Sequence, residues 1–181
     1  MSFTLVQKLR NKIRIKGDLD LSLAKNAKIV GCDIFVNGKN NQLIIEKNVK
    51  IRLTKIEIVG DNCCITVGEN TTIGHNSYLS AKEGRTLSIG RDCMFSRNVK
   101  VMTSDGHFIY KNREILNKGK DIVIENNVWL ADNVTILKGV HISSGSVVGI
   151  DATLTRNLPS NSIAAGNPAK IIQENIEFWE A

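Results

Sequence analysis

His107 lies in a polar segment, residues 103–121, and is the side chain in this sequence best suited to move a proton. An imidazole has an unperturbed pKa of about 6.5, so near neutral pH it can accept a proton from a hydroxyl group. Asp105, two residues earlier, or the backbone could orient the ring. A lone loop histidine is more often an ordinary surface residue, so its setting must decide between the two interpretations. If the structure delivers the ring to a substrate, the residue type predicts general base catalysis.

A six-residue repeat surrounds this segment and predicts the structure that positions it. Twelve blocks each begin with an aliphatic or aromatic residue and carry Asn, Asp or Gly at the fourth place. The blocks begin at Ile45, Ile58, Val67, Ile73, Ile89, Phe95, Ile124, Leu130, Ile136, Ile142, Val148 and Leu154. The fourth places are Asn48, Asp61, Asn70, Asn76, Asp92, Asn98, Asn127, Asn133, Gly139, Gly145, Asp151 and Asn157. These three residue types adopt positive φ most readily, which marks each fourth place as a corner of the chain.

Three corners per coil predict an all-β fold, a parallel β-helix with coils of roughly 18 residues that stack like parallel strands. We expect a single domain over residues 1–181, with coils over residues 17–170. The segment of about 103–121 breaks the repeat and must be extruded from the coils. Residues 1–16 are expected to form an N-terminal cap with a short helix between residues 2 and 13. Residues 171–181 are expected to cap the other end as a short helix or an extended tail.

Composition narrows the classes of partner and location. The chain has 24 basic and 18 acidic residues, a formal charge of +6, which favours an anionic partner. The charges are scattered and not interleaved with aromatic residues, so nucleic acid is not expected as a partner. No apolar stretch is long enough for a signal peptide or a membrane span, and we expect a cytoplasmic protein without membrane insertion. The four cysteines form no CxxC pair and are expected to be reduced and buried.

Three segments resemble the hexapeptide-repeat acyltransferases, and within them the sugar O-acetyltransferase branch. They are TSDGHFIY at residues 103–110, NVWL at residues 127–130 and AGNPAK at residues 165–170. The resemblance implies a left-handed β-helix, assembled as a homotrimer with active sites at subunit boundaries. It implies transfer of acetyl from acetyl-CoA to a hydroxyl of a carbohydrate acceptor such as a capsule or O-antigen polysaccharide or its precursor, without a metal. His107 would be the general base in that reaction.

The resemblance and the predicted stacking together give an expected donor groove. Trp129 is predicted to point outward, either as a wall beside the thioester and the acceptor or as a trimer contact. Residues 18 apart share a face, so Trp129, Ala131 and Asp132 are expected to stack under Val147, Gly149 and Ile150. Gly149 lacks a side chain, which would let a narrow pantetheine chain approach the backbone near Ala131, Asp132 and Gly149.

The resemblance also implies contacts to the nucleotide end of coenzyme A and to the acceptor sugar. By the same spacing Lys138 is expected below Arg156, and Thr155, Arg156 and Lys170 match family positions near the nucleotide end of coenzyme A. Cations there would pair with phosphates, although each could equally be a solvated corner charge. Asn76 and Tyr110 are the expected contacts to the acceptor sugar.

Three alternatives remain beside this reading. An amino-sugar or antibiotic N-acetyltransferase would use the same fold and donor. A zinc carbonic anhydrase would need three converging imidazoles, and neither His75 nor His141 has a second histidine at the required spacing. A non-catalytic scaffold does not require a histidine-bearing excursion or a groove glycine.

Overall fold

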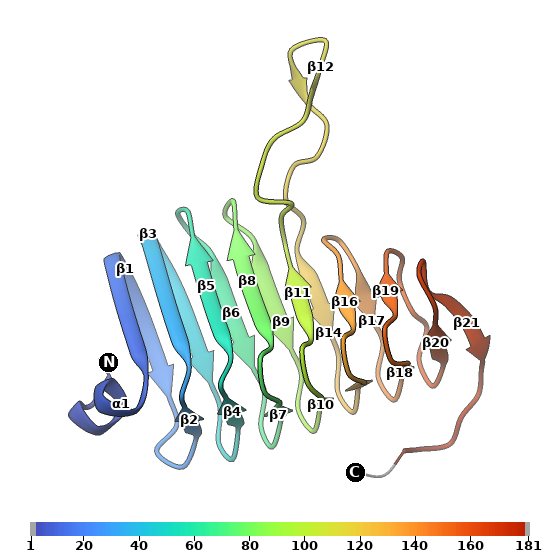
Figure 1. Cartoon of the computed structure of the whole chain (residues 1–181), viewed down its shortest axis with the longest axis horizontal. Coiled ribbons are helices and arrows are strands. Elements are labelled where there is room, and N and C mark those ends of the chain that lie inside the picture. The colour runs from blue at the N-terminus through green and yellow to red at the C-terminus, as the bar shows by residue number, and fades with distance from the viewer. Residues whose placement is uncertain (1–2, 180–181) are drawn as a thin grey trace.

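The structure is a computed structural model that describes residues 3–179. The chain winds through successive three-sided coils about one long axis, from the short N-terminal helix at one end to the last strands at the other (Figure 1). The winding is left-handed, and each coil pairs with the next through parallel strands. The predicted all-β, left-handed parallel β-helix is therefore confirmed.

Two sheets supply the three faces of this solenoid. The first and second faces belong to one eleven-stranded sheet that bends over a corner. The long strands β1 (Lys12–Leu23) and β3 (Asp33–Ile45) run through both faces. The first face continues with β5 (Lys55–Val59), β8 (Tyr78–Lys82), β11 (Lys100–Met102), β16 (Thr135–Ile136) and β19 (Thr153–Leu154). The second face continues with β6 (Cys64–Val67), β9 (Thr86–Ile89), β14 (Ile122–Ile124) and β17 (His141–Ile142). The third face is an eight-stranded sheet. Its strands are β2 (Lys28–Val30), β4 (Lys50–Arg52), β7 (Thr72–Ile73), β10 (Met94–Phe95), β15 (Trp129–Leu130), β18 (Val147–Val148), β20 (Ile163–Ala165) and β21 (Lys170–Gln173).

Left-handed backbone turns the chain at the corners, as the repeat predicts. Ten of the twelve predicted corner residues have φ between 56° and 81°. The prediction is wrong for Asp61 and Asn157. At the first of these corners Gly60 and Asn62 take the positive φ instead. At the second, the Asn157 side chain caps the corner by accepting a hydrogen bond from the backbone N–H of His141 at 2.9 Å.

Amide side chains join the corners from coil to coil. Asn48 Nδ2 donates to Asn70 Oδ1 at 2.9 Å on one edge of the solenoid. On another edge Asn98 donates to Asn133 at 2.9 Å, and Asn133 donates to Asp151 at 2.8 Å. Asparagine has two roles at these positions. It tolerates left-handed backbone conformation, and its side-chain amide forms a hydrogen bond to the next coil.

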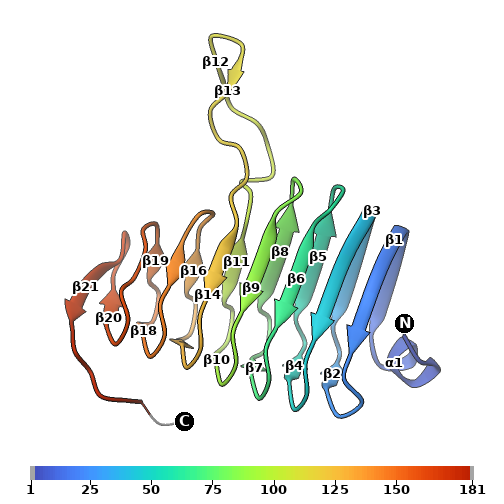
Figure 2. The same cartoon turned by 180° about the vertical axis from the view of Figure 1, so that it is seen from behind.

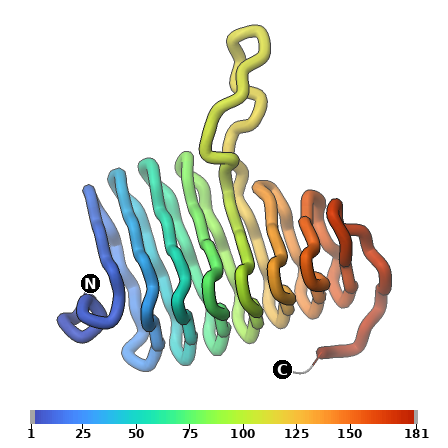
Figure 3. The backbone as a smooth tube through the Cα atoms, in the orientation of Figure 1, coloured from blue at the N-terminus to red at the C-terminus, as the bar shows by residue number. Residues whose placement is uncertain are grey.

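Coil length differs between the two halves, which the sequence prediction missed. Asn48 and Asn70, one coil apart, are separated by 22 residues, whereas Asn133 and Asp151 are separated by 18. The coils before the excursion are longer because strands such as β5 have five residues, with both Ile56 and Ile58 buried, whereas β16 and β19 have two. The tube in Figure 3 shows the taller coils on the N-terminal side. The value of roughly 18 holds only for the coils that follow the excursion.

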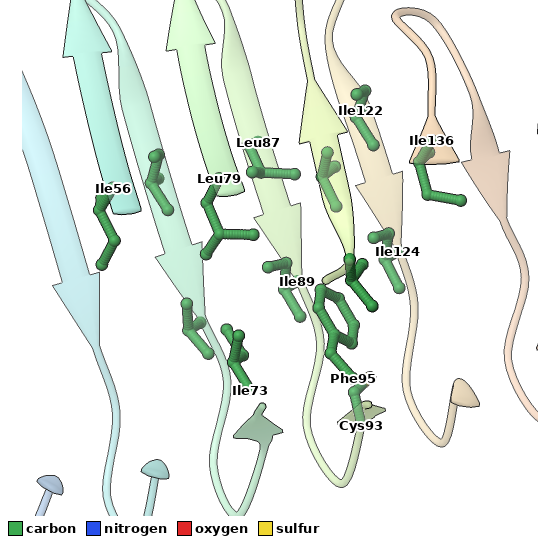
Figure 4. Close-up of a cluster of buried hydrophobic side chains, with 14 of the residues drawn as sticks. Ile56, Ile73, Leu79, Leu87, Ile89, Cys93, Phe95, Ile122, Ile124 and Ile136 are labelled. Carbon is green, nitrogen blue, oxygen red and sulfur yellow. The ribbon is translucent and has the colours of Figure 1, made fainter. Parts of the chain in front are cut away.

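The interior is a column of mostly aliphatic side chains that point inward from all three faces (Figure 4). Phe95 is the largest side chain that is fully buried, at 1% exposure, and it lies among Ile73, Ile89 and Ile124. The residues that directly follow most of these corners are small or aliphatic and are also buried, and Cys93 is one of them. All four cysteines are free thiols, and burial raises the pKa of Cys93 to about 11.

The two ends depart from the predicted caps. Helix α1 (Leu5–Arg10) is shorter than the predicted span of 2–13, and Thr4 caps it. β1 begins at Lys12, so the first coil starts inside the predicted cap of residues 1–16. At the other end β21 pairs antiparallel with β20 and an extended segment follows, so the tail forms and the C-terminal helix does not. Residues 1, 2, 180 and 181 lie outside the described part. Within residues 3–179, no helix has the length and apolar character needed to cross a membrane.

Candidate functional site

A hairpin leaves the solenoid between β11 and β14 and stands away from the coils (Figure 2). Its strands are β12 (Tyr110–Lys111) and β13 (Glu114–Ile115), which pair antiparallel. The predicted excursion of about 103–121 is this hairpin together with its stem. Near the tip Phe108, Ile109, Tyr110 and Leu116 expose large apolar surface, between 48% and 61% of each residue. Apolar surface of this kind on a projecting element indicates a contact beyond this chain.

His107 lies exposed on the stem of the hairpin, directly after a bend at Gly106. Gly106 has φ +84°, a conformation that side chains rarely adopt. The carbonyl oxygen of His107 accepts a hydrogen bond from Asn117 Nδ2 at 2.8 Å. The Asn117 side-chain oxygen accepts another from the backbone N–H of Ile109 at 2.6 Å. The main chain from the His107 carbonyl to the Ile109 N–H is therefore held by Asn117, while His107 itself is exposed.

Asp105 has partners other than the imidazole that it was predicted to orient. Its Oδ2 accepts hydrogen bonds from Asn117 Nδ2 at 2.8 Å and from the ammonium of Lys138. The Lys138 hydrogen bond lowers the pKa of Asp105, and Asn117 adds to the effect. Among residues 3–179 the hydrogen bonds of this carboxylate hold the stem of the hairpin to the next coil, and none reaches His107.

Glu83 joins the two sides of the stem where the hairpin leaves the coils. One carboxylate oxygen accepts from the Ser104 hydroxyl, and the other accepts from the backbone N–H of Gly119 at 2.7 Å. Glu83 itself has φ +60° at the corner of the preceding coil. The corner one coil below the hairpin thus supplies the side chain that closes its base.

Trp129 points outward on the third face, as predicted, and is partly covered. Its strand β15 pairs with β10 and β18, which set Met94 and Val147 on either side of it. The indole Nε1 donates to Ser96 Oγ at 3.2 Å. Trp179 from the C-terminal tail packs against the ring at a centroid distance of 6.0 Å, and its own Nε1 donates to the carbonyl of Asn127 at 2.7 Å.

The expected donor groove beside Trp129 offers fewer backbone groups to a ligand than predicted. Stacking of residues 18 apart is confirmed at Trp129 and Val147. The N–H groups of Ala131 and Gly149, however, donate to carbonyls of the next coil at 2.9 and 2.8 Å, so they are not available to hold a ligand. A Cβ on Gly149 would lie 3.2 Å from Ala165 Cβ, so this glycine also admits the neighbouring coil.

Asp132 and Ile150, the remaining residues of that stack, differ in their surroundings. The Asp132 carboxylate accepts from both the backbone N–H and the guanidinium of Arg97, and the guanidinium lowers the pKa of Asp132. This ion pair was not predicted. Ile150 is 60% exposed and remains open to a ligand or to another chain.

Thr155, Arg156 and Lys170 lie near the C-terminal end of the solenoid. All three are exposed, which phosphate binding would require. Lys138 has a different setting. Its ammonium donates to Asp105 and to the carbonyl of Asn117, and its side chain is 17% exposed. The 18-residue register holds up to Leu137, whose backbone N–H donates to the carbonyl of Leu154 at 3.1 Å, and it shortens to 16 residues between His141 and Asn157. The hydrogen bonds of the Lys138 side chain go to the hairpin and not to Arg156.

The residues expected to meet the acceptor do not gather within one chain. Asn76 is an exposed corner residue between the third and first faces, with φ 59°. Tyr110 is on the hairpin, with its ring edge-on to Phe108. The other two histidines also lie apart: His75 at an exposed corner, and His141 on the second face beside Glu125 at 2.7 Å. Residues 3–179 contain no group of three His, Cys, Asp or Glu side chains arranged to hold a metal ion.

One chain also separates the candidate base from the candidate donor groove. The hairpin with His107 rises from the corner between the first and second faces, whereas Trp129 lies on the third face, opposite that corner (Figure 1). The sequence therefore suggested candidate side chains without their relative positions. The prediction missed Glu83, Asn117, Arg97 and Trp179. Of these, only Glu83 carries a signal in the sequence, as a charged residue at the corner that precedes the excursion.

Comparison with known proteins gives this arrangement its context. No protein-family model matches the chain. A polysialic acid O-acetyltransferase of Escherichia coli O1:K1 / APEC is 37% identical over 137 residues, 75% of this chain and 43% of that protein. The galactoside O-acetyltransferase of Escherichia coli strain K12 is 31% identical over 144 residues, 72% of this chain and 70% of that protein. The solved structure of the polySia-specific acetyltransferase NeuO has a TM-score of 0.72 at 34% identity, covering 94% of this chain and 85% of that one.

The extent of these matches differs. The chain spans about half the length of the polysialic acid O-acetyltransferases that it matches, 43% of one and 54% of another. It spans more than two thirds of the galactoside enzyme and of the solved structure, and the solenoid extends over nearly the whole chain. Because both the sequence and the fold agree over these lengths, the chain belongs to the hexapeptide-repeat O-acetyltransferase family.

Proposed function

We propose that the protein is an acetyl-CoA-dependent O-acetyltransferase that acetylates a hydroxyl of a carbohydrate, with a polysaccharide or its precursor as the acceptor class. The observation that carries the proposal is the exposed imidazole of His107 on a braced hairpin in a chain of this family. The relatives that it resembles include enzymes named for polysialic acid and for galactosides. The formal charge of +6 favours an acidic polymer among such acceptors.

His107 acts as the general base in this mechanism. A hydroxyl is a poor nucleophile near neutral pH, and the imidazole takes its proton as the oxygen attacks the acetyl carbonyl. In acetyl-CoA the acetyl group is activated as a thioester, and the coenzyme A thiolate is a fair leaving group. The protein therefore needs neither a covalent intermediate nor a metal. Since the carboxylate of Asp105 is held by Lys138 and Asn117, it supports the main chain around His107 and does not orient the ring.

The donor would lie along the third face. Trp129 offers an apolar wall, Gly149 adds no side chain beside it, and Ile150 adds exposed apolar surface. Arg156 and Lys170 are exposed cations for the phosphates. The N–H groups of Ala131 and Gly149 are already used between coils, so they are not oxyanion donors in this proposal.

Copies of the chain would have to combine to bring base and donor together. His107 and Trp129 lie on opposite sides of one solenoid, and the hairpin exposes Phe108, Ile109 and Leu116 at its tip. A hairpin that packs against the third face of a neighbour would cover these side chains and bring an imidazole to that neighbour's groove. A homotrimer is the assembly that family membership suggests, and the cytoplasm is the compartment we expect for it.

The test is an acceptor screen with purified protein and acetyl-CoA, in which free thiol is measured together with the mass of the product. His107→Ala should fold normally and lose between about a hundredfold and ten-thousandfold of the turnover number. His75→Ala is the matched control, because His75 is another exposed histidine, at a corner away from the hairpin. It should keep near-wild-type turnover.

Two outcomes would contradict the proposal in different ways. Near-wild-type turnover of His107→Ala would remove the imidazole from the mechanism. Acetylation of amino sugars with no hydroxyl acceptor in the screen would replace O-acetyl transfer by N-acetyl transfer on the same fold.

A further inference from the structure

We infer that Glu83, Asn117 and Lys138 are positioning residues that hold the stem of the hairpin and thereby fix the location of His107. The inference rests on the proposed role of His107 as the base. None of the three touches the imidazole, and each acts through the main chain of residues 104–119. The predicted 18-residue spacing placed Lys138 beside Arg156 as a possible phosphate contact, and none of the three segments that carry the family resemblance contains Glu83 or Asn117.

Glu83 ties the entry of the stem to its exit. Its two carboxylate oxygens accept from the Ser104 hydroxyl and from the Gly119 N–H, so one side chain bridges both sides of the loop. Backbone bonds add to this closure: Lys120 N donates to the carbonyl of Thr103 at 2.9 Å. The base of the hairpin is thus closed by a carboxylate from the preceding coil.

Asn117 crosses the stem above this closure. Its amide nitrogen donates to Asp105 Oδ2 and to the His107 carbonyl, both at 2.8 Å, and its oxygen accepts from the Ile109 N–H at 2.6 Å. A single amide therefore uses donor and acceptor together on residues that flank the imidazole. Aspartate at this position could not make the two donations and would face the carboxylate of Asp105.

Lys138 attaches the stem to the following coil. Its ammonium reaches both the Asp105 carboxylate and, at 2.7 Å, the carbonyl of Asn117, and its side chain is 17% exposed. An ammonium that is so covered and already holds an anion is poorly placed to bind a phosphate. The mostly buried charge is stabilised by these two acceptors.

The need for such bracing follows from where the hairpin lies. The solenoid fixes its own residues by burial and by coil pairing, but residues 103–121 leave the interior and have only the short β12–β13 pair of their own. A base that drifts by about 1 Å can cost about a hundredfold in rate. Side chains from the coils on either side of the hairpin supply the rigidity that the loop lacks.

The first test separates positioning from donor binding at Lys138. Lys138→Met should lower the turnover number between about tenfold and a hundredfold while the Michaelis constant for acetyl-CoA changes less than about twofold. Lys138→Arg keeps the positive charge and can still donate to both Asp105 and the Asn117 carbonyl. Its turnover number should therefore be much closer to that of wild type than that of Lys138→Met. Lys47→Met is the matched control, because Lys47 is an exposed lysine that pairs with Glu69 at 3.1 Å on another edge of the solenoid. A raised Michaelis constant with unchanged turnover would instead assign Lys138 to a phosphate and overturn the inference.

The second test measures the brace without catalysis. Hydrogen exchange at the Gly119 amide should speed up in Glu83→Ala, and exchange at the Ile109 amide should speed up in Asn117→Ala. Glu83→Gln retains one acceptor and should show a smaller change. Faster exchange with full turnover, or unchanged exchange, would refute positioning. If His107→Ala stays active, the proposed role of His107 as the base is wrong. The exchange measurements do not depend on that role, so they still show whether Glu83 and Asn117 hold the stem.

Discussion

The coils and the hairpin are stabilised by different means, and the difference explains where the function lies. In the coils, side chains such as Ile56 and Phe95 are buried almost completely, and corner asparagines bond from one coil to the next. In the hairpin, His107 and its neighbours are exposed, and side-chain hydrogen bonds from Glu83, Asn117 and Lys138 replace a core. The repeated coils form a wall that gives a stiff support, and His107, the proposed base, lies where the repeat is interrupted.

The largest expected effect compares one phenylalanine from each region. Phe95→Ala should lower the free energy of unfolding by about 3–5 kcal/mol, because it leaves a cavity in a closed interior. Phe108→Ala, at a position that is 48% exposed on the hairpin, should cost less than about 1 kcal/mol. Denaturant unfolding at one fixed protein concentration measures both. Equal losses would mean that another copy of the chain buries Phe108 as deeply as the core buries Phe95.

The same contrast decides what could be predicted from the sequence. Corners such as Asn133 and Asp151 could be predicted because local φ preference and six-residue spacing depend only on the sequence. The excursion was found because its polar residues cannot line an interior. The 22-residue coils were missed because Ile56 and Ile58 extend a strand by alternation, not by another block.

The brace of the hairpin could not be predicted for a related reason. Which side chain meets which across coils depends on coil length, and the chain changes from 22 residues to 18 at the excursion. The hydrogen bonds of Glu83 with Gly119 and of Lys138 with Asn117 join residues from different coils. A single sequence gives the residue types of these pairs without the register that brings them together.

The second prediction concerns the corners that make the wall regular. Asn133 has φ 62° and bonds to both Asn98 and Asp151. Asn133→Ala loses both bonds and strains the left-handed backbone, and should cost about 1–3 kcal/mol. Asn133→Gly loses the bonds but keeps the conformation, and should cost about 1 kcal/mol less than the alanine variant. Thermal unfolding of the two variants side by side measures the difference. Equal midpoints would show that the corner tolerates a left-handed alanine without strain.

The smallest expected effect compares two carboxylates, one on the wall and one on the hairpin. On the wall, burial opposes ionisation of Glu57, but hydrogen bonds from Lys82, Tyr78 and Lys55 outweigh it and lower the pKa of Glu57 to about 2. On the hairpin, Lys138 lowers the pKa of Asp105 in the same direction. A carboxylate with a lowered folded pKa stabilises the fold above its ordinary pKa and loses that contribution as the pH falls towards the folded value.

Between the ordinary pKa of Glu57, 4.5, and about 2, wild type should therefore lose stability faster than Glu57→Gln, and the two thermal midpoints should converge. Asp105→Asn should leave this acid-induced loss almost unchanged, because the hairpin can open locally while the coils stay folded. It should instead speed hydrogen exchange in the stem, since asparagine cannot hold Lys138 as an ion pair. If Asp105→Asn reduces the loss of thermal stability at acid pH as much as Glu57→Gln does, the hairpin unfolds together with the coils. The wall and the hairpin would then be one cooperative unit, and the imidazole of His107 would depend on global stability and not on its local brace.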